Sequence, residues 1–125
     1  MIYRRDFFLI VSLLVLGWFF LLLLAQSSYA AAPTVLGYQG RLTDLAGNPL
    51  GGKGTIYFFK FSIWDNENIK FGNRLWPANA PQSVALVVEN GNFDVNIGDY
   101  NFSKSQAVYL QIEVSSDNIN FQTLS

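Results

Sequence analysis

The sequence predicts a small antiparallel β-sandwich, immunoglobulin-like or transthyretin-like, that follows an N-terminal hydrophobic segment. Within the 125-residue chain, several short runs carry apolar side chains at alternate positions, which is typical of strands. Turn residues separate these runs, and no window beyond the N-terminal segment shows a capped helical period. We therefore expect about seven short strands, with a small closed barrel as the alternative.

The first 30 residues have the layout of a secretory signal. Arg4 and Arg5 form a positive end, and an uncharged apolar run extends from Phe7 to Ala25. Small and polar residues follow, with the small-x-small pattern that precedes a cleavage site. We place that site between Ala30 and Ala31.

The apolar run also permits a second interpretation, an uncleaved anchor in the inner membrane formed by residues 7–25. A membrane-spanning helix needs about 20 apolar residues, whereas the apolar core of a cleaved signal usually has about 7–15. Length favours the anchor, and the small residues before Ala31 favour cleavage. Under both interpretations residues 31–125 are exported, to the periplasm, the cell surface or the medium, and only the N-terminal segment meets the membrane.

The composition of the exported part excludes several classes of function. Without Arg4, Arg5 and Asp6 this part is weakly acidic and has no basic cluster, so no nucleic-acid partner is expected. The chain has no Cys and no His, which removes disulfides, the usual general base near neutral pH and the commonest zinc ligand. Because no set of nucleophile, base and orienting group can be found, we expect no enzyme activity, no cofactor and no metal ion.

The β-domain is expected over residues 35–125, after a short linker at residues 31–34. Its first strand is predicted at Leu36–Leu42. The Gly- and Pro-rich stretch that follows is predicted to be a turn. Asp44 can accept a hydrogen bond from the backbone two residues on, and Gly47 can adopt a positive φ.

Arg41 is the one charged residue within this first strand. Isolated charges on strands are usually exposed, so we expect Arg41 to be solvated or to form a surface salt bridge. The alternative is a buried fork from the guanidinium to a carboxylate, Asp44 or Asp65, which would tie a loop to the sheet.

The second strand is predicted at Thr55–Trp64, where the alternation is clearest. One face carries Tyr57, Phe59, Phe61 and Ile63. The opposite face carries Ile56, Phe58, Lys60, Ser62 and Trp64, and because it is only half polar we expect part of it to be covered. A weaker strand is predicted at Lys70–Trp76, between loops at residues 65–68 and 77–82.

Asn90 and Gly91 predict a two-residue hairpin of type I′, because both central residues of that turn need a positive φ. This turn pairs Glu89 with Asn92. The predicted apolar pairs are then Val88 with Phe93, Leu86 with Val95, and Val84 with Ile97. All six share one face, whereas a slip of one residue would turn one strand over.

Two more strands complete the predicted domain. Val108–Val114 alternates again, and a turn at residues 115–118 leads to a last strand within Ile119–Leu124.

From "LGYQGRLTDLAGNPLGG" onward, the sequence resembles a module of bacterial exported proteins that begins with a "YQGRLTD" pattern. The resemblance covers about residues 35–125 and includes "NRLW", "VVENGNFDVNIG" and "AVYLQIEV". Proteins with this module are mostly uncharacterised secreted or surface proteins, in which it often follows the signal peptide. The resemblance implies the N-terminal domain of a longer surface protein, truncated here at its C-terminal end.

Together these features predict a non-enzymatic interaction or structural module of a bacterial surface or secreted protein. Its exposed edges and half-apolar face would contact downstream domains of the same protein or other surface proteins. The alternative is a carbohydrate-binding module for cell-wall or extracellular glycans, because exposed aromatic rings offer flat faces on which sugars stack. The candidate aromatic residues are Trp64, Trp76, Tyr100, Phe102 and Tyr109.

Two loops rich in Asp and Asn, at residues 65–68 and 117–120, supply oxygen atoms of the kind that bind Ca²⁺. Neither loop has the spacing of an EF-hand. Asp and Asn are also preferred turn residues, and we favour that role for both loops.

Overall fold

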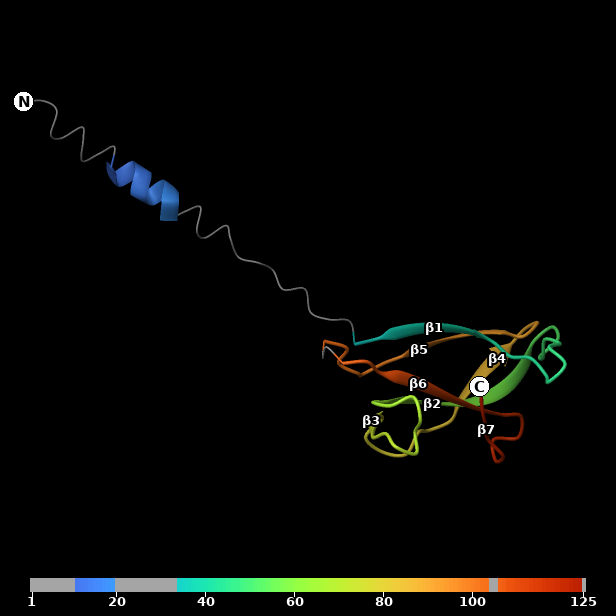
Figure 1. Cartoon of the computed structure of the whole chain (residues 1–125). Coiled ribbons are helices and arrows are strands. Elements are labelled where there is room, and N and C mark those ends of the chain that lie inside the picture. Colours follow the sequence, from blue (N-terminus) through green and yellow to red (C-terminus); the bar gives the residue numbers. More distant parts are fainter. Residues whose placement is uncertain (1–10, 20–33, 104–105, 125) are drawn as a thin grey trace, which may run out of the picture. The chain divides into compact units, whose positions relative to one another are not determined.

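A computed structural model of the chain describes residues 11–19, 34–103 and 106–124 (Figure 1). The chain divides into two compact units, Met1–Ala31 and Ala32–Ser125. In the second unit the described residues form β-strands and no helix, so the all-β prediction is confirmed. The strands are β1 (Leu36–Arg41), β2 (Thr55–Trp64), β3 (Arg74–Trp76), β4 (Val84–Val88), β5 (Asn92–Ile97), β6 (Tyr109–Ser115) and β7 (Gln122–Thr123).

The predicted N-terminal signal is described only over residues 11–19, which form a short helix with exposed side chains. No helix within the described ranges is long and apolar enough to cross a membrane, so a long apolar helix is not found. The positive end at Arg4 and Arg5 and the cleavage site at Ala30 and Ala31 lie outside the described residues. The cleaved signal and the anchor both stay predictions.

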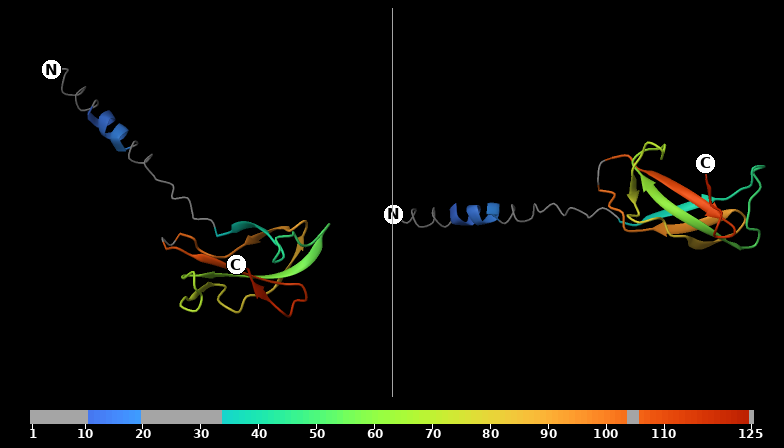
Figure 2. Two further views of the ribbon diagram at one scale, coloured as in Figure 1. Left: turned by 45° about the vertical axis from the view of Figure 1, so that its right-hand side comes forward. Right: turned by 90° about the horizontal axis from the view of Figure 1, so that it is seen from below.

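The strands form two antiparallel sheets. β1 and β5 make a two-stranded sheet, and the five-stranded sheet has the order β3–β2–β6–β7, with β4 also paired to β2. In Figures 1 and 2 the β1–β5 pair lies across from β2 and β6. The strands within the described ranges do not close into a ring, so the alternative of a small closed barrel is not formed.

The turn at Asn90–Gly91 forms as predicted, with φ angles of 47° and 82°. Glu89 and Asn92 also pair across it as predicted. Beyond this bridge β4 pairs with β2 and β5 pairs with β1, so the long hairpin is wrong. The incorrect pairs are Val88–Phe93, Leu86–Val95 and Val84–Ile97. The two strands separate because each finds its partner in a different sheet.

The stretch after β1 is joined to this turn by backbone hydrogen bonds. The Leu42 N–H donates to the Gly91 carbonyl, and the Gly91 N–H donates to the Leu50 carbonyl, both at 2.6 Å. The Asn90 N–H donates to the Gly52 carbonyl at 2.8 Å. The Gly- and Pro-rich stretch after β1 is therefore a structural loop that fixes the junction between the two sheets.

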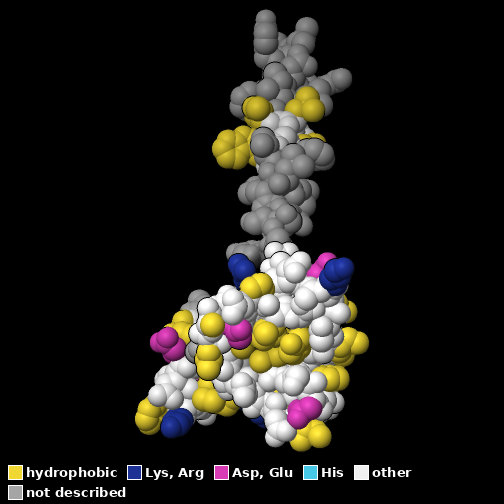
Figure 3. Space-filling model, turned by 90° about the vertical axis from the view of Figure 1, so that its right-hand side faces the viewer, with side chains coloured by type: hydrophobic (Ala, Val, Ile, Leu, Met, Phe, Trp, Pro, Cys, Tyr) yellow, Lys and Arg dark blue, Asp and Glu magenta, His cyan; other side chains and the backbone are white. Residues whose placement is uncertain are grey.

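The outer face of the five-stranded sheet is half apolar and partly covered, as the β2 pattern predicted. Ile56 of β2 pairs with Val87 of β4, and these side chains are 56% and 60% exposed. Lys60 of β2 lies over the ring of Phe121, with Nζ 4.0 Å from the ring centroid. Figure 3 shows a different side of the β-rich unit, the end that lies at the right in Figure 1, where hydrophobic side chains gather among few charged residues.

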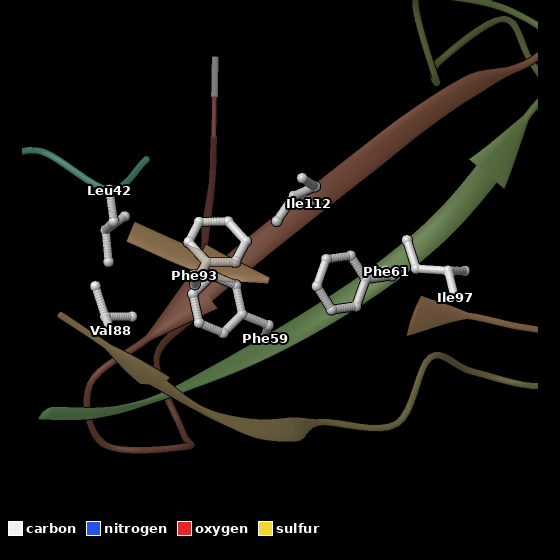
Figure 4. Packing of buried hydrophobic residues seen from close by; sticks show 7 residues of the cluster. All are labelled: Leu42, Phe59, Phe61, Val88, Phe93, Ile97 and Ile112. Carbon is white, nitrogen blue, oxygen red and sulfur yellow. The ribbon is translucent and has the colours of Figure 1, made fainter. Parts of the chain in front are cut away.

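The hydrophobic core lies between the two sheets (Figure 4). Phe59 of β2 is fully buried, and its ring centroid lies 4.5 Å from that of Phe93 in β5. Phe61 stacks beside Phe59 at 6.0 Å. The buried cluster comprises Leu42, Phe59, Phe61, Val88, Phe93, Ile97 and Ile112. The predicted inward face of β2 is therefore confirmed.

Candidate functional site

The two sheets differ in width, and this difference leaves a groove on one side of the core. Asn92 of β5 exchanges two backbone hydrogen bonds with Glu89, at 2.9 and 3.0 Å, so the outer edge of β5 faces β4. The other edge of β1 pairs with no described strand, and it lines a space together with β6 and β7. We call the space of about 780 Å³ that β1, β6 and β7 line the inter-sheet groove.

The floor of the inter-sheet groove is apolar. Its apolar side chains are Tyr38, Leu42, Leu50, Tyr57, Leu110, Ile112, Val114 and Leu124. Leu42 and Ile112 are buried, but the others are only partly buried although they pack against the core. Full burial of an apolar side chain is worth about 1.5–3 kcal/mol, so the incomplete cover leaves part of this stabilisation unused.

Arg41 lies on the rim of the inter-sheet groove and is exposed. Its guanidinium forms no hydrogen bond or ion pair with any residue in the described ranges, so the buried fork to Asp44 or Asp65 is not seen. A guanidinium carries five N–H donors. Arg41 can therefore still bind an acidic group.

Three aspartates, Asp44, Asp65 and Asp117, organise the loops around the sheets. Each carboxylate accepts hydrogen bonds from its own loop, and the backbone N–H donors with the largest effect belong to Asn48, Asn73 and Asn120, respectively. Because these bonds favour the charged form, they lower the pKa of all three carboxyl groups.

The loops at residues 65–68 and 117–120 have the turn role that the sequence favoured, because Asn66 Oδ1 accepts the Asn68 N–H and Asp117 Oδ1 accepts the Ile119 N–H, both at 2.9 Å. The loop after β1 follows its prediction too, because Asp44 Oδ1 accepts the Ala46 N–H at 2.9 Å and Gly47 has a φ of 85°.

The substitution Asp117→Asn is expected to lower the Tm at neutral pH and to weaken the loss of stability in acid. Asp117 Oδ1 accepts bonds from Ser115 Oγ, the Ile119 N–H and the Asn120 N–H, at 2.7, 2.9 and 2.8 Å. Because the fold lowers the pKa of Asp117, its ionised carboxylate stabilises the fold above the unfolded-state pKa of about 3.8. That stabilisation is lost as the pH falls from this value toward the folded-state pKa. Thermal unfolding between neutral and strongly acidic pH measures the effect.

Glu67→Gln is the matched control, because Glu67 is exposed and its carboxylate accepts no hydrogen bond from a described residue. Its Tm is expected to follow that of the unchanged chain throughout. An Asp117→Asn chain whose Tm deficit is the same at neutral and acidic pH would contradict this role of Asp117.

A second concave surface lies beside Trp64 and Tyr109, which pair across β2 and β6. Both line an open space of about 550 Å³ together with the polar side chains of Asn66, Glu67 and Gln111. Tyr109 is 39% exposed and Trp64 is half-buried. We call this surface the Trp64–Tyr109 hollow. It combines aromatic faces with amide and carboxylate groups.

The other predicted surface aromatics lie elsewhere. Trp76 is partly buried and packs against the core. Tyr100 is only 9% exposed and packs edge-on against Phe102, with ring centroids 4.8 Å apart, so the prediction of a surface position for Tyr100 is wrong. Tyr100 is fixed by a bond from its N–H to the Thr34 carbonyl at 3.3 Å, a contact between segments far apart in the sequence.

Sequence reasoning did not predict the inter-sheet groove. Its lining comes from β1, the loop after it, β2, and the β6–β7 region, and no local pattern joins these segments. The alternation in β6 did predict that Leu110, Ile112 and Val114 share a face, but alternation does not say how completely another strand covers that face.

The fold and the groove define an all-β protein with two antiparallel sheets of unequal width and an open space between them. The chain belongs to the family described as "Domain of unknown function (DUF8740)", whose model matches residues 37–125. No significant match was found among curated proteins or among solved structures. The resemblance to the "YQGRLTD" module of exported proteins stays a prediction.

Proposed function

We propose that residues 35–125 form a small β-sandwich, immunoglobulin-like or transthyretin-like, that acts as a non-enzymatic protein-interaction module of an exported protein. Two antiparallel sheets with a shared core support the sandwich. The positive end and the apolar run of the N-terminal segment support export. Downstream domains or other surface proteins are the expected partners.

The inter-sheet groove is the observation that carries this proposal. Clustered apolar side chains that remain exposed on a small protein mark an interaction site. In the groove, Leu110, Val114 and Leu124 form a cluster that is only partly buried, and a polar rim with Arg41 borders it. A partner that enters the groove would complete the burial of Leu110, Val114 and Leu124, which are now only partly buried.

Photo-crosslinking in the native host tests the proposal. Tyr38 lines the groove, whereas Phe71 is 79% exposed and lines neither the groove nor the Trp64–Tyr109 hollow, and an azido-phenylalanine resembles both native side chains in size. We expect the full chain to form a discrete adduct with a second protein from position 38 and little adduct from position 71. Equal adducts from both positions, or none from position 38, would contradict the proposal.

A second candidate function is glycan binding, and the Trp64–Tyr109 pair beside Asn66 and Gln111 favours it. Aromatic faces stack on sugar rings, while amide groups can hydrogen-bond the hydroxyls. A tryptophan-fluorescence titration of the full chain with cell-wall glycans separates the two candidates. The interaction module predicts no saturable change, whereas a change that Tyr109→Ala abolishes would favour glycan binding.

A further inference from the structure

Among the described strands only β5 pairs with β1, so the other edge of β1 carries unused backbone hydrogen-bonding groups. In the continuous register between β1 and β5, the Leu42 N–H donates to the Gly91 carbonyl, which makes Leu42 a hydrogen-bonded position. Hydrogen-bonded positions alternate along an antiparallel pair. The backbone groups of Gly37, Gln39 and Arg41 must therefore point away from β5, toward the groove side.

The hydrogen bonds on the outer edge of β5 confirm independently which residues of β1 point away from β5. Asn92 of β5 pairs with Arg41 of β1, yet its N–H and carbonyl both bond to Glu89, on the side away from β1. Arg41 and Asn92 are thus a non-hydrogen-bonded pair, and Gln39 with Asp94 is the next such pair along the register. The Gln39 N–H therefore faces the groove side of β1.

The open edge of β1 and the apolar floor of the inter-sheet groove both lack a covering strand. β5 lies beside β4, and β1 lines the inter-sheet groove together with β6 and β7, so the edge of β1 away from β5 opens toward these two strands. Adjacent strands lie about 4.8 Å apart and packed sheets about 10 Å apart. A strand added to β1 would consequently lie over β6 and β7 and cover Leu110, Val114 and Leu124.

A second copy of the chain does not fit this position. Pairing of β1 with the β1 of another copy would continue the narrow sheet across a two-fold axis. Each copy would then bring its own β6 and β7, which line the groove beside β1, into the space that β6 and β7 of the other copy occupy. The groove therefore fits an extended segment that brings no second layer of its own beneath it.

The charged side chains on the rim indicate one more feature of the segment that would enter the groove. The rim also carries the ionised carboxylates of Asp44 and Asp117, so a preference for an acidic side chain is confined to the end of β1, where Arg41 has no described partner. An acidic side chain on the entering segment would form a charge-assisted hydrogen bond with Arg41. A basic side chain at the same place would be repelled.

We propose that the groove binds an extended segment of a partner protein, which adds to β1 as a third strand. Alternate apolar side chains of this segment pack on the β6 floor, and an acidic side chain meets Arg41 at the end of β1. The proposal rests on the proposed interaction function and names its mode: main-chain hydrogen bonds supply affinity, and the alternate apolar positions supply specificity.

A phage-displayed library of random peptides tests this mode on the full chain in mild detergent. β1 has 6 residues, so peptides of roughly ten residues are long enough to pair along all of it. We expect selection to enrich peptides with alternating apolar residues and an acidic residue near one end. Recovery of no peptides above background, or of peptides without alternation, would overturn the proposal.

Two variants at one position then test the strand edge itself. Gln39→Ala removes the exposed side chain but keeps the N–H that faces the groove side, and should change peptide affinity by less than about threefold. Gln39→Pro removes this N–H and places a ring on the edge, and should weaken binding by at least about tenfold. Proline at an N–H that bonds no other strand is compatible with an edge strand.

Methylated peptides provide a measurement that leaves the protein unchanged. Methyl groups on alternate backbone nitrogens of a selected peptide block either the edge that faces β1 or the opposite edge. Only one of the two methylated series should lose binding. If both series bind alike and Gln39→Pro binds like Gln39→Ala, strand addition is wrong, although a position-38 adduct would still support the interaction function.

Discussion

Phe59→Ala is expected to lower the free energy of unfolding of the β-rich unit by about 3–5 kcal/mol. The Phe59 ring is fully buried and lies at the centre of the core, against Phe93 of the narrow sheet and Phe61 of its own strand. Its removal would leave a cavity between the two sheets and weaken the contact that joins them. Because domains have only about 5–15 kcal/mol of stability in total, most of it would be lost. Guanidinium unfolding followed by tryptophan fluorescence measures this change.

Ile56→Ala is the control for this prediction. Ile56 lies on the same strand, but its side chain points outward and is 56% exposed. Its loss is expected to cost less than about 1 kcal/mol. Equal losses for Phe59→Ala and Ile56→Ala would show that the core does not lie between β2 and β5.

The sequence was sufficient to predict the features that depend on residues close together along the chain. The faces of β2 followed from the two-residue period of a strand, and the positive φ of Asn90 and Gly91 followed from turn chemistry. Val88 and Phe93 are both buried even though they do not pair, because the turn still directs their side chains to the same side. Local patterns thus predicted which side chains are inside.

Partner choice between distant strands could not be predicted in this way. The turn and the apolar pattern agreed on a β4–β5 hairpin, but Leu36 of β1 pairs with Ile97 and Tyr57 of β2 pairs with Leu86 instead. Both arrangements keep these side chains on the inward face, although Val84 is 41% exposed in the structure, so hydrophobic pattern alone does not distinguish them. The same limit applies to Tyr100, whose N–H bonds to the Thr34 carbonyl in the segment before β1.

To predict the inter-sheet groove, one further fact is needed, the number of strands in each sheet. β6 alternates in the same way whether its inner face is covered by a full sheet or by the edge of β1. The half-burial of Leu110 and Val114 follows only from the difference in width between the two sheets. A candidate site of this kind becomes visible only once the topology is known.

Gly51→Ala is the second substitution with a large expected effect, a loss of about 2–5 kcal/mol. Gly51 has a φ of 92°, a conformation that costs a residue with a Cβ about 1–2 kcal/mol. A Cβ at this position would also overlap the Val88 carbonyl oxygen and lie 2.7 Å from the carbonyl carbon of the same residue. The backbone would have to move where Leu50 and Gly52 bond to the Asn90–Gly91 turn, at the junction between the two sheets.

Gly47→Ala separates the conformational cost from the cost of the overlap. Gly47 has nearly the same φ, 85°, but no atom lies within 4 Å of the position that its added methyl group would take. It should show only the conformational cost of about 1–2 kcal/mol. Denaturant unfolding of both variants and of the unchanged chain gives the comparison. A loss for Gly51→Ala no larger than that for Gly47→Ala would mean that the loop yields to the added methyl group, and that its bonds to the Asn90–Gly91 turn do not hold the sheets in register.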